Sequence, residues 1–211
     1  MRQRRLKYLD ERLANVADLL DYDGKENKGK WRDVLGKEKI FLEIGCGKGK
    51  FVCSHAEADP DLGFIAVEGQ INAVVRAAEK LKESGLSNVY YIASYIHDIH
   101  EYFDVGEVDG IYLNFSDPWP KAKHEKRRLT HRDNLNGYMD VLKEDGFIEF
   151  KTDNQNLFEF SVAEVLSQEY DILEITRDLE NDDFTSKLFK TEYEERFLAM
   201  GKKINYMRIG R

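Results

Sequence analysis

The sequence predicts an α/β fold with a mostly parallel, seven-stranded sheet, helices on both faces and an antiparallel edge. Two patterns lead to this prediction. Apolar runs of strand length alternate with helical segments of about ten or more residues, which is typical of a parallel sheet covered on both sides. The last two apolar runs lack a long crossover of the earlier kind, so we expect them to form an antiparallel pair.

The individual elements follow from local patterns, taken in chain order. Strands are expected where short apolar runs are bounded by glycine or polar residues, and helices where apolar residues recur every three to four positions, as in 71–81. The expected strands are 39–44, 63–68, 88–94, 108–115, 146–152, 170–176 and 204–209. The expected helices are 49–58, 70–82, 130–142, 156–167 and 191–200.

Size and composition indicate one domain. The chain has 211 residues, of which 42% are hydrophobic and 34% charged, as is ordinary for a soluble globular enzyme. Residues 1–30 are polar and charged, and we expect a mobile basic arm there, with a helix near 9–20, ahead of a single domain over 31–211. No apolar run reaches the ~20 residues of a membrane span, and no signal-peptide core follows the basic N-terminus, so we expect a cytoplasmic protein.

Cysteine and histidine spacing predicts no metal site. Cys46 and Cys53 are the only cysteines, and neither has the spacing of a metal or redox motif, so we expect reduced thiols. His97 and His100 are three residues apart, but no cysteine or third histidine is near them in sequence. The sequence does not distinguish a monomer from a homodimer.

Positive charge is clustered in a chain whose net charge is −8. That net charge argues against nucleic-acid binding over the whole surface, but it leaves room for a local basic patch. One cluster lies near the N-terminus and comprises Arg2, Arg4, Arg5 and Lys7. The second comprises Lys121, Lys123, Lys126, Arg127, Arg128 and Arg132. Phosphate contact is one interpretation of this cluster, and a solvated helix face with Glu125 pairing a neighbour is the other.

A stiff turn precedes this cluster. The apolar run 111–115 leads directly into Asp117 and Trp119, each next to a proline that restricts the backbone. In open α/β sheets ligands bind where such strands end, which favours a role in binding or catalysis for Asp117 over that of a turn acceptor. Trp119 is either a stacking surface for a base or a residue that packs the turn.

The first strand ends in a glycine-rich loop of the form E-x-G-x-G-x-G. Its residues are Glu43, Gly45, Gly47 and Gly49, and the second strand ends in Glu68. A dinucleotide site would prefer G-x-G-x-x-G, and the acid before the first glycine would repel a pyrophosphate. The same acid suits the sulfonium and ammonium groups of S-adenosylmethionine, while Glu68 can accept hydrogen bonds from ribose hydroxyls. The loop therefore favours S-adenosylmethionine over NAD.

Four segments in this order resemble the bacterial tRNA (guanine-N7-)-methyltransferase family. They are the loop 43–49, Asn114-Phe-Ser-Asp-Pro-Trp-Pro-Lys121, Phe150-Lys-Thr-Asp-Asn154 and Thr191-Glu-Tyr-Glu194. The resemblance covers roughly residues 30 to 210, and the segment around Asp117 is very specific by itself. It implies the Rossmann-like class I methyltransferase fold and methylation of N7 of a guanosine in the tRNA variable loop.

The resemblance also implies roles for individual residues. The implied cofactor-binding residues are Glu43, Gly45, Gly47, Gly49, Glu68, Tyr95 and Asp117, with Asp117 also catalytic. The implied guanosine and tRNA contacts are Lys121, Asp153, Thr191, Glu192, Tyr193 and Glu194. The implied RNA-contacting stretch is Lys123, His124, Lys126, Arg127 and Arg128. Tyr95 departs from the family, which usually has Asp or Asn there to hold the adenine, and Asp98 is an alternative for that contact.

The residue types suit this chemistry. Guanine N7 carries no proton at neutral pH, so the site needs alignment and charge stabilisation rather than a strong base. Asp117 and Asp153 are the candidates for the stabilising carboxylate. Thr191 with Glu194 three residues later also reads as a helix cap, which is compatible with substrate contact.

Two other functions remain open from the sequence. One is an amino-group methyltransferase acting on glutamine or adenine, whose families carry an Asn/Asp-Pro-Pro-aromatic turn. Trp119 stands here in place of the second proline. The other is a non-catalytic tRNA-binding module with a vestigial cofactor pocket, supported by Tyr95 alone.

Overall fold

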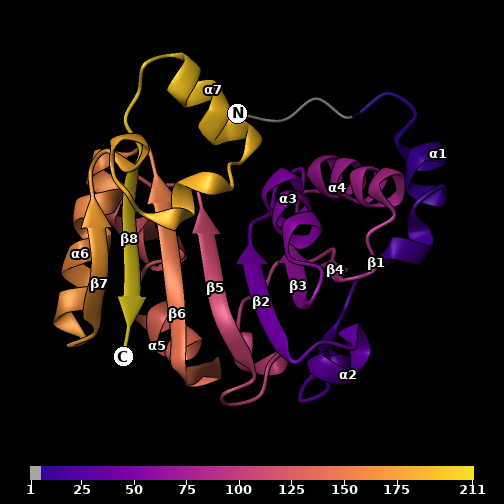
Figure 1. Cartoon of the computed structure of the whole chain (residues 1–211), viewed down its shortest axis with the longest axis horizontal. Coiled ribbons are helices and arrows are strands. Elements are labelled where there is room, and N and C mark those ends of the chain that lie inside the picture. Colours follow the sequence, from indigo (N-terminus) through magenta and orange to yellow (C-terminus); the bar gives the residue numbers. More distant parts are fainter. Residues whose placement is uncertain (1–5) are drawn as a thin grey trace.

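The computed structural model describes residues 6–211 and contains one eight-stranded sheet in the order β1-β4-β3-β2-β5-β6-β8-β7 (Figure 1). The strands are β1 (Leu20–Asp21), β2 (Lys39–Ile44), β3 (Leu62–Val67), β4 (Val89–Ile92), β5 (Val108–Asn114), β6 (Leu142–Thr152), β7 (Asp171–Thr176) and β8 (Asn205–Gly210). Pairing from β1 through β6 is parallel, and β8 runs antiparallel to both β6 and β7. The expected antiparallel pair of the last two strands is confirmed.

Helices cover both faces of the sheet. They are α1 (Leu9–Ala14), α2 (Trp31–Leu35), α3 (Lys50–Ala58), α4 (Ile71–Ser84), α5 (Arg132–Val141), α6 (Gln155–Ser167) and α7 (Glu192–Ala199). The short 3₁₀ turns are η1 (Ala17–Leu19), η2 (Lys25–Asn27), η3 (Ile99–Glu101), η4 (Ala122–Arg127), η5 (Leu179–Asn181) and η6 (Thr185–Leu188). One apolar cluster joins the sheet to α2, α5 and α6, and a second joins it to α3 and α4. Burial of these apolar side chains is the main force that holds the layers together.

The strand count differs from the expected seven because β1 is only two residues long. Leu20 and Asp21 pair with Tyr91 and Ile92 of β4, where they form one edge of the sheet. Two residues cannot display the alternation by which a strand is recognised in a sequence.

The structure also differs from the expected arm over residues 1–30. Leu9, Val16 and Leu20 are buried, and the Arg12 guanidinium pairs with Glu79 of α4. Residues 9–30 therefore pack onto the sheet edge and α4 because they contribute apolar side chains to a core formed elsewhere in the chain. The basic residues Arg2, Arg4 and Arg5 lie outside the described residues, and a single domain over 31–211 stays a prediction.

This architecture brings the carboxyl ends of the parallel strands to one edge of the sheet. In Figure 1 the arrowheads of β2, β5 and β6 point to the same side, and α7 lies over that side near β5 and β6. The predicted site segments lie at the carboxyl ends of the parallel strands or at the start of α7. Within residues 6–211, no helix combines the length and apolar character needed to cross a membrane.

Candidate functional site

The loop between β2 and α3 requires glycine for two different reasons. Gly45, Gly47 and Gly49 have φ angles of 80°, 58° and 73°, which non-glycine residues adopt only with strain. A Cβ at Gly45 or Gly47 would meet no atom within 4 Å, so only the backbone angle selects glycine there. A Cβ at Gly49 would lie 2.2 Å from the Tyr91 hydroxyl oxygen, so close packing selects glycine as well. The loop can therefore approach a ligand closely along its backbone.

Glu43 lies beneath this loop and is only 2% exposed. Its Oε1 accepts a hydrogen bond of 2.9 Å from the Asn114 amide, while its Oε2 and the Asn114 Oδ1 are buried without a hydrogen-bond partner among the described residues. Burial raises the pKa of Glu43 to about 7, and the Asn114 amide opposes that rise. Unpaired buried acceptors are costly, and a cationic group is the partner that such oxygens suit. These residues thus fit the cationic end of S-adenosylmethionine.

Glu68 follows β3 and is bound to the same loop. Its two oxygens accept hydrogen bonds from the backbone N–H groups of Gly47, at 3.0 Å, and of Gln70, at 2.7 Å. Burial raises its pKa, and the Asp117 carboxylate contributes to the rise. The acid predicted for ribose binding therefore lies against the glycine loop.

Tyr95 lies beside Glu68 at the end of β4 and is 57% exposed. A Cβ at Gly69 would lie 2.5 Å from the Tyr95 ring, so the ring packs directly over the Gly69 backbone. Burial raises the pKa of Tyr95, and the carboxylates of Glu68 and Asp117 add to that rise. An exposed aromatic ring at this point presents a face on which a planar base can stack.

The turn after β5 holds Asp117 on a strained backbone. Phe115 and Trp119 have φ angles of 52° and 39°, which are uncommon for residues with a Cβ. Such strain persists only where surrounding contacts impose it, and it is frequent at functional sites. Asp117 itself is exposed at the tip of this turn.

Arg128 supplies the contacts that hold the turn. Its guanidinium donates hydrogen bonds to the carbonyl oxygens of Pro118, at 3.1 Å, and Trp119, at 3.0 Å, and it stacks 4.1 Å from the Phe160 ring centroid. Arg128, which was predicted to contact RNA, therefore uses its guanidinium to bind the turn. The position of Arg128 in the sequence, ten residues after Pro118, gives no indication of these hydrogen bonds.

Trp119 packs against the basic stretch that follows it. The Arg127 guanidinium lies 5.0 Å from its ring centroid, and the His124 ring contacts it edge-on at 5.8 Å. Lys121, Lys123 and Lys126 are exposed around η4, with Lys126 lying 3.6 Å from Asp133. These contacts are with the basic stretch and not with the apolar core, so both interpretations of Trp119 stay predictions.

The start of α7 shows which of its residues face outward. The Thr191 hydroxyl accepts a hydrogen bond of 2.9 Å from the Glu194 N–H, which confirms the predicted helix cap. Glu194 is buried, and Glu192 pairs with Lys80 of α4 at 2.6 Å. Tyr193, which is 47% exposed, is the most accessible aromatic residue of this helix.

Tyr193 packs against the turn that carries Asp117. Its ring centroid lies 5.3 Å from that of Phe115 in the turn and 4.4 Å from that of Phe197. Burial raises its pKa, and Asp153 and Asp117 add to the rise. Asp153 in turn lies 3.5 Å from the Lys202 ammonium. The ring contact with Phe115 therefore places Tyr193 against the turn that carries Asp117, and the charges of Asp153 and Asp117 act on it.

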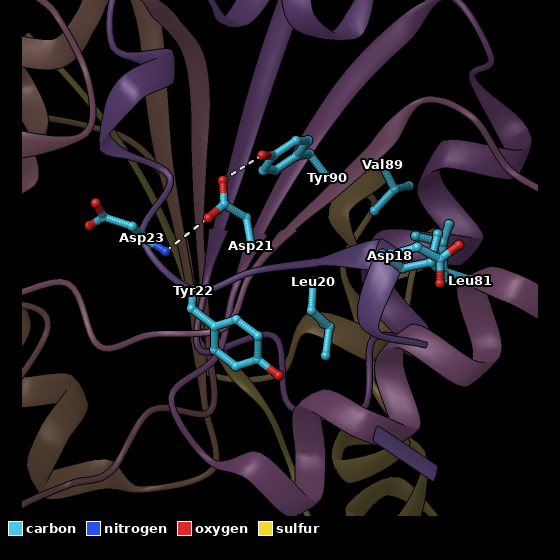
Figure 2. Close-up of a pocket in the computed structure, with 9 residues that line it drawn as sticks. Asp18, Leu20, Asp21, Tyr22, Asp23, Leu81, Val89 and Tyr90 are labelled. Atoms are coloured by element: carbon cyan, nitrogen blue, oxygen red, sulfur yellow. Dashed lines mark hydrogen bonds between the residues drawn. The ribbon is translucent and has the colours of Figure 1, made fainter. Parts of the chain in front are cut away.

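A separate pocket of about 580 Å³ lies at the β1 edge and contains none of the predicted site residues (Figure 2). Its lining includes Asp21, Leu81, Val89 and Tyr90. The Asp21 carboxylate accepts hydrogen bonds from the Tyr90 hydroxyl, at 2.6 Å, and the Asp23 N–H, at 2.9 Å, so it serves to build the chain turn there. Within residues 6–211, no group of three or more His, Cys, Asp or Glu side chains could hold a metal ion.

The architecture is a Rossmann-like α/β fold, which solved methyltransferase structures share. A solved structure described as an antibiotic-related methyltransferase aligns with a TM-score of 0.62, covering 86% of this chain and 92% of its own length, at 21% identity. The 16S rRNA methyltransferase KamB aligns with a TM-score of 0.62 over 85% of this chain and 91% of its own length, at 11% identity. At such identities the likeness carries the fold alone.

Sequence comparison narrows this class to one family. Residues 37–207 match a family described as "Putative methyltransferase". A tRNA (guanine-N(7)-)-methyltransferase of Geobacillus kaustophilus (strain HTA426) is 42% identical over 97% of this chain and 94% of its own length. The protein of that name from Streptococcus agalactiae serotype III (strain NEM316) is 40% identical over 97% of each chain. The chain belongs to the tRNA (guanine-N(7)-)-methyltransferase family.

Proposed function

We propose that this protein transfers the methyl group of S-adenosylmethionine to N7 of a guanosine in the variable loop of tRNA. The observation that carries the proposal is the position of Asp117. It follows β5 in the turn whose Phe115 ring lies 5.3 Å from that of Tyr193, and its charge acts on Glu68 and Tyr95, so we infer that it lies between the candidate cofactor and substrate residues. Family membership supports the same reaction.

Each candidate cofactor residue suits a different group of S-adenosylmethionine. Glu43, with its unpaired Oε2, suits the cationic end, and Glu68 suits the ribose hydroxyls. Tyr95 suits the adenine by stacking, which replaces the polar contact usual in the family. When bound, S-adenosylmethionine supplies a methyl group already activated by its sulfonium.

The protein's own task is alignment and charge stabilisation. Guanine N7 presents a lone pair without a proton, so no side chain has to remove one. Alignment of the two reactants alone can lower the barrier by about 7–11 kcal/mol in ideal intramolecular cases. The Asp117 carboxylate would accept from the guanine N1–H and amino group and offset the positive charge that methylation creates on the purine.

We propose Tyr193 rather than Trp119 as the surface on which the guanine stacks. Both rings have neighbours in the structure, but Tyr193 is 47% exposed whereas Trp119 is partly buried against Arg127 and His124. An extruded base is usually stabilised by such an aromatic face. Lys121, Lys123 and Lys126 would contact the RNA phosphates, since they are exposed next to the turn.

The test is transfer of a labelled methyl group to unmodified tRNA, followed by nucleoside mass spectrometry. We expect 7-methylguanosine from the wild type and a loss of about 100-fold or more in kcat/KM in Asp117→Ala, as for removal of a transition-state contact. Asp183→Ala, at an exposed carboxylate on a different loop, is the matched control and should keep full activity. Methyl groups on an exocyclic amine would instead support the amino-group methyltransferase.

Calorimetric titration with S-adenosylhomocysteine, the demethylated product of the cofactor, distinguishes a methyltransferase from the remaining alternative function. A non-catalytic tRNA-binding module with a vestigial pocket would bind tRNA but not this product. Micromolar binding of the product removes that alternative.

A further inference from the structure

The side chain of Lys151 is 0% exposed, which is unusual for an ammonium group. Lys151 lies on β6, two residues before Asp153. Its Nζ donates hydrogen bonds to the carbonyl oxygens of Ser186 and Phe189, the latter at 3.0 Å, and lies 3.5 Å from a Glu194 oxygen. An ammonium is costly to bury unless partners of this kind compensate it.

These partners all belong to the segment that ends in α7. Ser186 lies in η6, Phe189 lies just before α7, and Glu194 lies in the first turn of α7. A second strand residue, Glu149, accepts a hydrogen bond of 2.7 Å from the Ser186 hydroxyl. One strand of the sheet thus anchors both the approach to α7 and its first turn from below.

The other ion pairs of α7 are more exposed than the pair between Lys151 and Glu194. Glu192 pairs with Lys80, and Glu195 pairs with Lys50, but all four side chains are at least partly exposed. Ion pairs at such positions contribute little because water screens them. Apolar packing of Phe197 and Leu198 against Leu179, Ile204 and Tyr206 holds the later part of α7. Among the ion pairs of α7 named here, the buried one between Lys151 and Glu194 is the one that fixes its first turn.

We propose that Lys151 is a positioning residue that holds Tyr193 in place for the substrate. Glu194 points into the protein to Lys151, and its neighbour Tyr193 points out beside Phe115 and Asp117. The inference rests on the proposed function, in which Tyr193 receives the guanine. Lys151 touches neither guanine nor cofactor in this scheme and acts only through α7.

The experiment compares Lys151→Met with Lys143→Met. Lys143 lies at the opposite end of the same strand and pairs with Asp109 at 2.6 Å, so it controls for loss of a lysine ion pair on β6. We expect Lys151→Met to lower kcat/KM for tRNA by about 10- to 100-fold, the scale of a misplaced substrate contact. Its affinity for S-adenosylhomocysteine should stay within about twofold of wild type, and Lys143→Met should change neither quantity.

A second variant makes the test independent of folding defects. Glu194→Gln keeps the size of the side chain but removes the charge that faces Lys151, and we expect the same selective loss toward tRNA. The double variant should be no worse than Lys151→Met, because Lys151→Met already breaks the contact that Glu194→Gln weakens and the two effects are then not additive. If Lys151→Met does not fold by circular dichroism, the comparison is made with Glu194→Gln alone.

Several outcomes would overturn the role of Lys151. These are unchanged kcat/KM for tRNA in a folded variant, an equal loss of affinity for S-adenosylhomocysteine, and additive effects in the double variant. A wild type that methylates no tRNA would refute the proposed function instead. An active wild type with indifferent variants would refute only the positioning role.

Discussion

Gly49 is the position at which the cofactor loop depends most on the absence of a side chain. Its φ is 73°, and a Cβ there would lie 2.2 Å from the Tyr91 hydroxyl and 3.0 Å from the Ala77 Cβ. Tyr91 is 1% exposed and lies between strand and helix, with its hydroxyl 3.6 Å from the Cys53 sulfur. The Gly49→Ala change therefore meets both backbone strain and a buried group that has little room to move.

The magnitude follows from these two costs. Placing alanine in the left-handed region costs about 1–2 kcal/mol. Forcing an extra methyl group against a packed core costs about 1–3 kcal/mol more. Together they predict that Gly49→Ala lowers the free energy of unfolding by about 2–5 kcal/mol. Gly85, with a φ of 67° and no atom within 4 Å of its Cβ position, should show only the first cost.

Urea unfolding at equilibrium measures both variants, with Gly85→Ala as the matched control. The added change Tyr91→Phe removes the clashing oxygen, so it should recover about 1 kcal/mol or more of the loss in Gly49→Ala. S-adenosylhomocysteine affinity should fall in Gly49→Ala and remain unchanged in Gly85→Ala. Equal stability losses at the two glycines, or no recovery on adding Tyr91→Phe, would refute the packing argument.

Two further predictions concern the acid under the loop and the arginine behind the turn. Burial raises the pKa of Glu43 to about 7, so below pH 4.5 this carboxyl is protonated in both the folded and the unfolded chain. As the pH rises from 4.5 to 7, the carboxyl ionises in the unfolded chain first, which lowers the free energy of unfolding. Glu43→Gln should thus gain up to about 3 kcal/mol of stability relative to wild type between pH 4.5 and 7, and a constant difference in urea unfolding over that range would contradict this. Arg128→Lys should lower the free energy of unfolding by about 1–3 kcal/mol, because a lysine cannot reproduce the paired bonds to two carbonyl oxygens. Lys123→Ala should leave the free energy of unfolding within about 0.5 kcal/mol of wild type and reduce the salt slope of tRNA binding by about 1, and an unchanged slope in filter-binding assays would contradict a phosphate contact at Lys123.

The long elements of the fold were predictable because each carries its own pattern. The strand expected at 39–44 is found with the same bounds, and the helix expected over 70–82 is α4, Ile71–Ser84. Their apolar residues repeat at strand or helix spacing over several turns, which is enough to identify them. The two-residue strand β1 and the five-residue helix α2 are too short to repeat any pattern, and both were missed.

The helix expected near 9–20 is found in part as α1, but the packing of residues 9–30 was not predictable, for a related reason. Leu9, Val16 and Leu20 are isolated apolar residues in a polar stretch, and nothing in the local sequence says that each is buried. Their burial depends on β4 and α4, which lie about seventy residues further along the chain.

The site also contains features that the sequence predicts and features that only the structure shows. The glycine loop, Asp117 and the cap of α7 are marked by residue types that local chemistry requires, since positive φ angles select glycine and a free helix N-terminus selects a hydroxyl. Asn114 as the partner of Glu43, and Arg128 as the clamp of the turn, depend on which strand ends meet. No spacing in the sequence encodes those meetings.

The sequence alone thus determined the class of fold, the loop for a cationic cofactor and the acid that faces it, because each is written in consecutive residues. Only the tertiary structure decided that Tyr193 is exposed while Trp119 lies against Arg127 and His124, and that Lys151 is buried under α7. The physical reason is that burial and charge pairing are properties of side chains brought together from distant strands. A lysine in a strand is read as exposed until the carbonyls and the carboxylate that surround it are known.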